Sequence, residues 1–79
     1  MNNLEKEIFQ RAYQSYLCGS DNYSYKFKST SANMLKKYNS AIKNLEKEGF
    51  ITINFQSEDK VKMLITEKGI DYGNFSLDM

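Results

Sequence analysis

A helical series of apolar residues ends at a glycine and leads directly into a β-rich segment, and this order limits the folds that the chain can adopt. The series keeps one helical phase, which predicts a continuous helix over residues 31–48; it consists of Met34, Leu35, Tyr38, Ala41, Ile42 and Leu45. Gly49 can adopt a positive φ, so that Phe50 packs back on the last helical turn. Residues 50–55 are β-branched and aromatic and predict a strand. The chain is therefore expected to have an α+β fold.

Apolar spacing predicts four further elements around this helix. In chain order they are a helix over residues 3–18, a strand over 23–28, a second hairpin strand over 60–65 after a turn at 56–59, and a short helix over 66–73. Asn3 and Thr66 are the expected N-caps of the first and last helices. Ser29, Thr30 and Ser31 all qualify as the N-cap of the long helix. No proline, repeat or linker interrupts the chain, so residues 1–79 are expected to form a single domain.

The first helix has a wider apolar surface than a one-sided helix requires. Its apolar residues span an arc of about 220°, whereas roughly 100° is enough to cover a core on one side. Either a second subunit covers the surplus, or Tyr13 or Tyr16 lies half exposed. Four apolar residues near the end of the sequence either fold back over the core or bind another subunit; they are Tyr72, Phe75, Leu77 and Met79. These features predict a homodimer formed through the first helix and the C-terminal tail.

Composition excludes most enzymatic chemistry. The 79 residues include no His and one Cys, so the chain can form neither a His-based triad nor an internal disulfide, and a zinc site is not expected. Glu5 and Glu7, two residues apart on a helix, do not share a face on which they could act together. Cys18 has no His partner to activate it. The sequence therefore predicts no catalytic residue, no metal and no cofactor.

The sequence contains no pattern of a targeting or membrane-spanning segment. Its first seven residues carry three charges in place of an apolar stretch, and its longest apolar run is residues 63–65. A single cysteine is also typical of a reducing compartment. The sequence predicts a cytoplasmic protein with no membrane partner.

The formal net charge of +1 hides an uneven distribution. Residues 26–47 carry six lysines and one glutamate, a net charge of +5, whereas residues 1–25 carry −1 and residues 48–79 carry −3. On the long helix, the side opposite the apolar stripe carries polar residues: Lys36, Ser40, Lys43 and Lys47, with Lys37 and Asn44 on one flank. Lysines can neutralise phosphates, and Ser and Asn can hydrogen-bond base edges. This face suits a DNA major groove, although a solvated face of a Lys-rich protein would have the same composition.

The order of the elements resembles a winged helix–turn–helix domain, as found in small bacterial repressors of the MarR and PadR kind. The resemblance rests on residues 41–51, Ala-Ile-Lys-Asn-Leu-Glu-Lys-Glu-Gly-Phe-Ile, and residues 64–69, Leu-Ile-Thr-Glu-Lys-Gly. In that family the first segment ends the recognition helix and enters the wing, and the second closes the wing and starts a last helix.

Two features depart from the family pattern. Only residues 29–33 are left for the helix that normally precedes the recognition helix. The acidic residues Glu58 and Asp59 occupy the tip of the wing, where a basic residue usually reaches the minor groove.

The resemblance implies sequence-specific binding of double-stranded DNA by a transcriptional regulator or repressor of a bacterium, phage or plasmid. The expected DNA contacts are Lys36, Lys37, Ser40, Lys43, Asn44 and Lys47, with Lys26 and Lys28 as nearby phosphate contacts. An alternative is a winged-helix protein-interaction module, a phage or plasmid factor acting on a host protein without DNA, which the acidic wing favours. A third hypothesis is binding of single-stranded nucleic acid through Tyr23, Tyr25 and Phe27, which requires these rings to face solvent.

Overall fold

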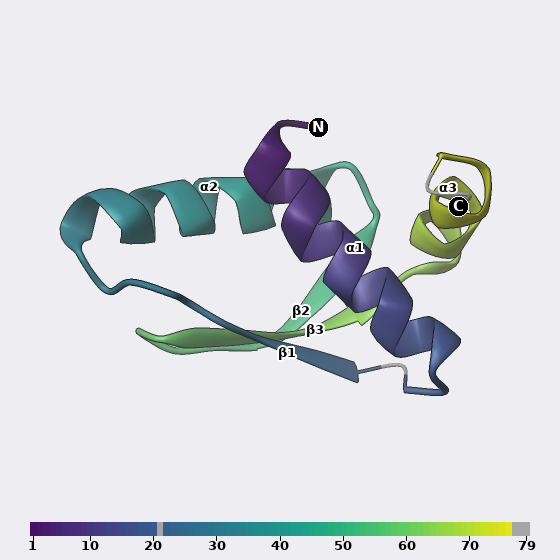
Figure 1. Cartoon of the computed structure of the whole chain (residues 1–79), viewed down its shortest axis with the longest axis horizontal. Helices are drawn as coiled ribbons and strands as arrows, with labels where there is room; N and C mark the ends of the chain where they lie inside the picture. The colour runs from purple at the N-terminus through teal and green to yellow at the C-terminus, as the bar shows by residue number, and fades with distance from the viewer. Residues whose placement is uncertain (21, 77–79) are drawn as a thin grey trace.

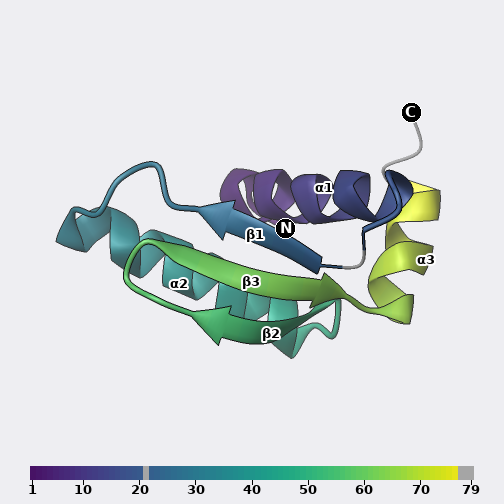
Figure 2. The same ribbon diagram turned by 90° about the horizontal axis from the view of Figure 1, so that it is seen from below.

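Two helices cover one face of a three-stranded antiparallel sheet, and a third helix packs beside the first at one end of the sheet (Figure 1, Figure 2). The computed structural model describes residues 1–20 and 22–76. The elements are α1 (Asn3–Leu17), β1 (Asn22–Lys26), α2 (Ala32–Lys47), β2 (Ile51–Gln56), β3 (Lys60–Ile65) and α3 (Glu67–Ser76). The strand order is β1-β3-β2. The predicted α+β class and order of elements are therefore confirmed.

The N-terminus of α1 is capped by Asn2, one residue before the predicted cap. The Asn2 Oδ1 atom accepts a hydrogen bond from the Glu5 backbone N–H at 2.8 Å, and the Asn2 N–H donates to Glu5 Oε1 at 3.3 Å. This reciprocal pair is a capping box. The prediction of Asn3 was wrong because two identical side chains stand next to each other, and Asn3 is the first residue of the helix.

The long helix is continuous, as predicted, and both of its ends have local causes. Ser31 caps the start, since its Oγ accepts a hydrogen bond from the Met34 N–H at 3.3 Å. At the other end Gly49 has a φ of +83°. The Phe50 N–H donates to the Leu45 carbonyl at 3.0 Å and the Gly49 N–H to the Glu46 carbonyl at 2.9 Å, which is a Schellman motif.

The segment between β1 and α2, residues 27–31, contains no helix. The Phe27 ring stacks on Tyr38 of α2, with ring centroids 4.7 Å apart, and the Lys28 N–H donates to the Tyr38 hydroxyl at 3.3 Å. The Phe27 N–H also bonds to the Asp59 carbonyl, which extends the pairing beyond β1. These contacts hold the segment in an extended conformation. α2 therefore follows strand β1 directly, and residues 27–31 do not supply the helix that a helix–turn–helix pair has immediately before its second helix.

The sheet presents one face to the helices and leaves the other uncovered. Tyr25, Val61 and Met63 are buried on the covered face, whereas the residues between them point away. The register of β2 against β3 shifts between Ile53 and Phe55, which is a β-bulge at Asn54.

Most of the wide apolar arc of α1 is covered within the chain, but Leu17 at its end is 61% exposed. Tyr13 is buried against Gly73 of α3, and its hydroxyl donates a hydrogen bond to Asn74 Oδ1. Tyr16 is half-buried. α3 therefore extends three residues beyond its predicted end and covers the Tyr13 flank of α1, and the half-buried Tyr16 agrees with the alternative that requires no second subunit. Of the four apolar residues named for the C-terminal tail, Leu77 and Met79 lie outside the described residues.

Candidate nucleic-acid interface

The exposed side of α2 carries four of the predicted DNA contacts in a single row. Lys36, Ser40, Lys43 and Lys47 are all exposed, and the buried residues of the helix lie on its other side. The last residue follows the first by eleven positions, so the row is about 16 Å long at the rise of an α-helix. We call these four residues the α2 face.

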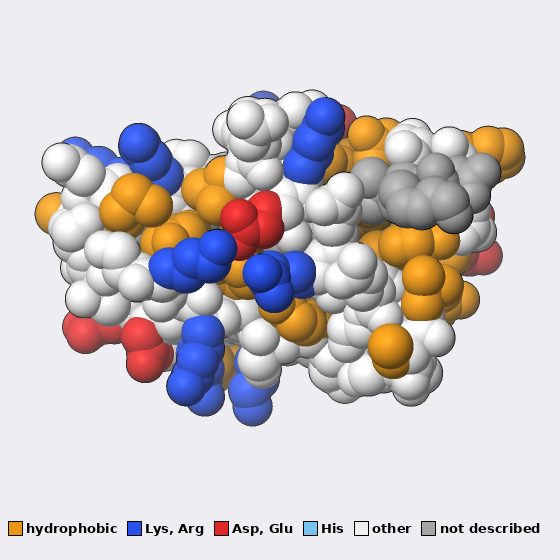
Figure 3. Space-filling model, viewed as in Figure 1, with side chains coloured by type: hydrophobic (Ala, Val, Ile, Leu, Met, Phe, Trp, Pro, Cys, Tyr) orange, Lys and Arg blue, Asp and Glu red, His pale blue; other side chains and the backbone are white. Residues whose placement is uncertain are grey.

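The lysines of the α2 face have no ionic partner in the described part of the chain. Both ion pairs found there involve Glu7, which bonds to Arg11 and Lys28. Figure 3 shows Lys and Arg side chains over the outer part of α2, away from the acidic side chains at the β2–β3 turn. The positive charge of this face is therefore free to meet phosphates.

A groove runs beside the α2 face where the start of α1 approaches α2. It has a volume of about 380 Å³ and is lined by Asn2, Leu4, Lys36, Lys37, Ser40 and Ala41. Lys37 thus lies on the flank of the helix, as predicted, and joins two members of the α2 face along one groove.

Asn44, the other predicted flank residue, holds α1 against α2. Its Nδ2 donates a hydrogen bond to Glu5 Oε2 at 3.0 Å. Glu5 is buried and also belongs to the capping box of α1. The amide of Asn44 therefore has a partner within the chain and supports the position of α2.

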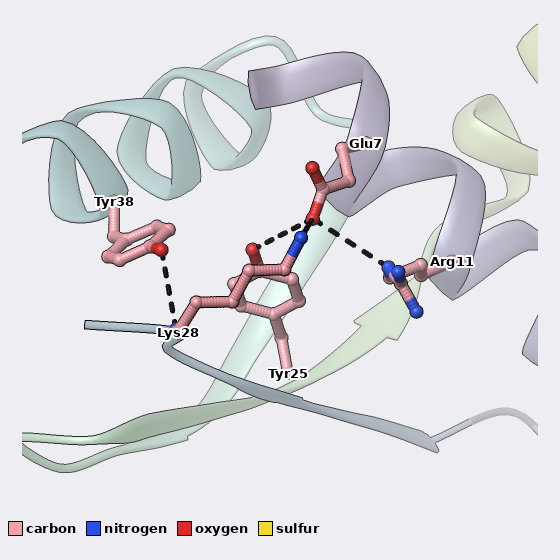
Figure 4. A network of polar contacts seen from close by, with 5 residues as sticks. All are labelled: Glu7, Arg11, Tyr25, Lys28 and Tyr38. Carbon is pink, nitrogen blue, oxygen red and sulfur yellow. Dashed lines mark hydrogen bonds and ion pairs between the residues drawn. The ribbon is translucent and has the colours of Figure 1, made fainter. Parts of the chain in front are cut away.

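Lys28 is likewise engaged within the chain. Its Nζ lies 3.1 Å from Glu7 Oε2, which also accepts a hydrogen bond from the Tyr25 hydroxyl at 3.2 Å (Figure 4). The hydrogen bond from Lys28 lowers the pKa of the Glu7 carboxyl, and partial burial opposes this effect. Burial, with the neighbouring charge of Glu7, raises the pKa of the Tyr25 phenol. Lys28 thus links the segment before α2 to α1.

Lys26 is separated from the α2 face by the whole core. It is exposed at the end of β1 and points away from the helices, because Tyr25 before it is buried beneath them. The structure therefore brings Lys36, Lys37, Ser40, Lys43 and Lys47 together but places Lys26 on the opposite side of the molecule.

The aromatic residues of β1 face the core. Tyr25 is 2% exposed, and Tyr23 and Phe27 are half-buried and pack on the core. The hypothesis that these three rings form an open platform for single strands is therefore contradicted.

The β2–β3 turn carries acidic side chains, as its sequence predicts. Glu58 and Asp59 are exposed, and Asp59 Oδ1 accepts a hydrogen bond from Ser57 Oγ at 2.9 Å. These residues line an open hollow of about 710 Å³ with Thr30 and Leu35. The carboxylates make this hollow unsuitable for phosphate.

Sequence reasoning missed the basic residues of β3 and the exposed ring of Phe55. Lys60 and Lys62 alternate with the buried Val61 and Met63, which is a period-two signal that the sequence does contain. The exposure of Phe55, at 48%, depends on the bulge at Asn54 and has no signal in the sequence.

Comparisons of the chain with known protein families, with curated proteins and with solved structures find no match. Among residues 1–20 and 22–76, no three His, Cys, Asp or Glu side chains gather in a group that could hold a metal ion. No helix in the described part of the chain is long and apolar enough to cross a membrane.

Proposed function

We propose that this domain is a winged-helix regulator of transcription that binds double-stranded DNA through the α2 face, with Lys37 on its flank. The observation that carries the proposal is a row of exposed lysines on one side of a helix, none of them paired with a carboxylate in the described chain. A helix whose polar side is exposed can enter a major groove, which is about 12 Å wide.

The residue types on the α2 face indicate how it would read DNA. Lys36, Lys43 and Lys47 would neutralise phosphates, and Ser40 at the centre of the row would hydrogen-bond a base edge or the backbone. The helix contains no Arg, so it lacks the side chain that reads guanine with two parallel hydrogen bonds. Phosphate contacts would therefore supply most of the affinity, which would fall steeply with salt.

The proposed assembly is a homodimer formed through the end of α1 and α3. Leu17 is 61% exposed and Phe75 is 87% exposed, and they belong to helices that pack together at this end of the domain. Figure 3 shows hydrophobic side chains gathered in this region. Two copies would present two α2 faces to a palindromic site. Sedimentation equilibrium is expected to give a dimer for the natural chain and a monomer for Leu17→Ser/Phe75→Ser; a monomeric natural chain would contradict the dimer.

The test of DNA binding uses matched variants on opposite sides of the domain. Lys43→Gln/Lys47→Gln removes two charges from the α2 face, and Lys60→Gln/Lys62→Gln removes two charges from the sheet. Fluorescence anisotropy with a labelled duplex of the DNA upstream of the coding sequence is expected to show binding that weakens about tenfold in the first variant. The second variant is expected to bind the duplex within about twofold of the natural chain. Equal binding by all three proteins would overturn the proposal.

A second candidate function is protein binding through the β2–β3 turn. The exposed Glu58 and Asp59 beside the hollow at Leu35 favour a basic partner protein. Co-purification from the native host with the natural chain, but not with Glu58→Gln/Asp59→Asn, would support this function. A loss of duplex binding in Lys43→Gln/Lys47→Gln alone would argue against protein binding as the function.

A further inference from the structure

The face of the sheet that the helices leave uncovered is basic. Figure 2 looks onto this face, with α2 behind the strands, α1 alongside β1 and α3 beyond the end of the sheet. The three strands contain three lysines, Lys26, Lys60 and Lys62, and no acidic residue. All three point away from the core, because side chains alternate along a strand and Tyr25 and Val61 are buried. Lys26 and Lys62 are exposed and Lys60 is half-buried.

The register places two of these lysines directly against each other. Lys26 and Lys60 are cross-strand partners, so their Cβ atoms lie about 5 Å apart. Like charges in this position are destabilising, and neither lysine has a carboxylate within 4.0 Å in the described chain. Asp59, adjacent in sequence, accepts a hydrogen bond from Ser57 within the turn. A bound anion would relieve the repulsion that the fold leaves uncompensated.

A bulge brings an aromatic ring onto the same face. Ile53 pairs with Met63 on the covered side, and regular alternation would place Phe55 on that side too. The extra residue at Asn54 instead sets Phe55 opposite Lys62, where its side chain is 48% exposed. The Lys62 Nζ lies 6.0 Å from the centre of the Phe55 ring.

The bulged residue adds a polar contact across the sheet. The Asn54 Nδ2 donates a hydrogen bond to Asn22 Oδ1 of β1 at 3.1 Å, so two side-chain amides meet over the intervening strand β3. We call Lys26, Lys60, Lys62 and Phe55, with these amides beside them, the sheet face.

We infer that the sheet face binds single-stranded nucleic acid. Phe55, on the edge strand β2, stacks on one base, and Lys62, Lys60 and Lys26 contact the phosphates of the strand as it continues from there across β3 and β1. An aromatic platform among lysines suits unpaired bases, whose flat faces are free, whereas the bases of a duplex are stacked on one another. The carboxylates of an acidic peptide would pair with the lysines, but such a peptide has no flat base to stack on the Phe55 ring. The sheet face lies on the side opposite the α2 face, so this inference does not depend on duplex binding.

The experiment measures anisotropy of labelled oligothymidylate and oligouridylate, each about twelve nucleotides long, with the full chain at low salt. Binding to either strand is expected, and the tighter of the two identifies DNA or RNA. Lys60→Gln/Lys62→Gln is expected to bind about tenfold more weakly. Phe55→Leu keeps an apolar side chain without a ring and is expected to bind at least about fivefold more weakly.

The matched control is Lys43→Gln/Lys47→Gln, which removes the same charge from the opposite side and is expected to bind the oligonucleotides within about twofold of the natural chain. Far-UV circular dichroism checks that each variant folds, which their surface positions favour. Two results would overturn the inference. One is the absence of oligonucleotide binding by the natural chain. The other is a pair of observations: Phe55→Leu binds the oligonucleotide unchanged, and polyglutamate with the same total negative charge as the oligonucleotide displaces it. This pair would identify an acidic peptide as the partner.

Discussion

The Glu7 side chain joins three parts of the molecule. Its carboxylate lies on α1 and bonds to Lys28 in the segment before α2, to Tyr25 in β1 and to Arg11 one turn along α1 (Figure 4). It therefore fixes the extended segment that takes the place of a helix before α2. The carboxylate is partly exposed, so its contribution to stability is expected to stay below about 1 kcal/mol.

The stabilisation by Glu7 is expected to depend on pH. Because Lys28 lowers the pKa of this carboxyl in the folded state, the stabilisation is present above the ordinary pKa of 4.5 and is lost as the pH falls through the lowered value. Urea unfolding is expected to show that Glu7→Gln is less stable than the natural chain at pH 7, with a smaller difference at pH 3. A difference that is the same at both pH values would contradict this role.

At Gly73, close packing against Tyr13 requires a glycine, although glycine has a low helix propensity. An added Cβ would lie 2.5 Å from the Tyr13 ring, closer than real side chains approach. In an open helix Gly→Ala stabilises by about 1 kcal/mol, whereas Gly73→Ala is expected to destabilise the domain by about 1–3 kcal/mol because α3 must move away from α1. Thermal unfolding shows whether Gly73→Ala lowers or raises the stability. A higher melting temperature would show that α3 does not pack as described.

At the scale of elements, the cross-strand pair of Lys26 and Lys60 offers a clean test of the sheet register. Lys60→Glu replaces repulsion by attraction and is expected to raise stability by about 0.2–1 kcal/mol at low salt. Lys60→Gln, which only removes the repulsion, is expected to give a smaller gain. Urea unfolding compares the three proteins; a loss of stability in Lys60→Glu would mean that the two residues are not partners.

The sequence predicts an element well where its signals are local. The bounds of α2 follow from one helical phase, a serine cap and Gly49, all within the helix or next to it, and the structure confirms them. The bulge at Asn54 could not be predicted, because it arises from pairing with a strand further along the chain. The exposure of Phe55 was missed for the same reason.

In the candidate site too, the features with local sequence signals were predictable and those that depend on tertiary contacts were not. Lys36, Ser40, Lys43 and Lys47 could be grouped from helical spacing alone, and the structure confirms that they share an exposed side. The engagement of Asn44 with Glu5 could not be read from the sequence, because it depends on how α1 crosses α2. Tertiary contacts of this kind decide which polar side chains remain free for a ligand.

At the scale of the whole molecule, the sheet and the helices divide the positive charge between two opposite sides. The sheet and the helices form two layers (Figure 1, Figure 2). The exposed α2 face lies opposite the buried residues of α2, and the lysines of the sheet face alternate with Tyr25 and Val61, which are buried beneath the helices. One straight duplex cannot contact both sides of a domain whose core lies between them. Double-stranded and single-stranded nucleic acid are therefore expected to bind without competing.

The salt dependence of duplex binding tests whether the α2 face is the surface that contacts DNA. Each neutralised phosphate contributes about −0.9 to the slope of log K against log salt concentration. Lys36, Lys37, Lys43 and Lys47 therefore predict a slope of about −3.6 per subunit, and Lys43→Gln/Lys47→Gln is expected to make it less steep by about 1.8. Lys60→Gln/Lys62→Gln is expected to leave the slope unchanged. A slope that the α2 variant does not alter would contradict the account, because duplex DNA would then lie on another surface.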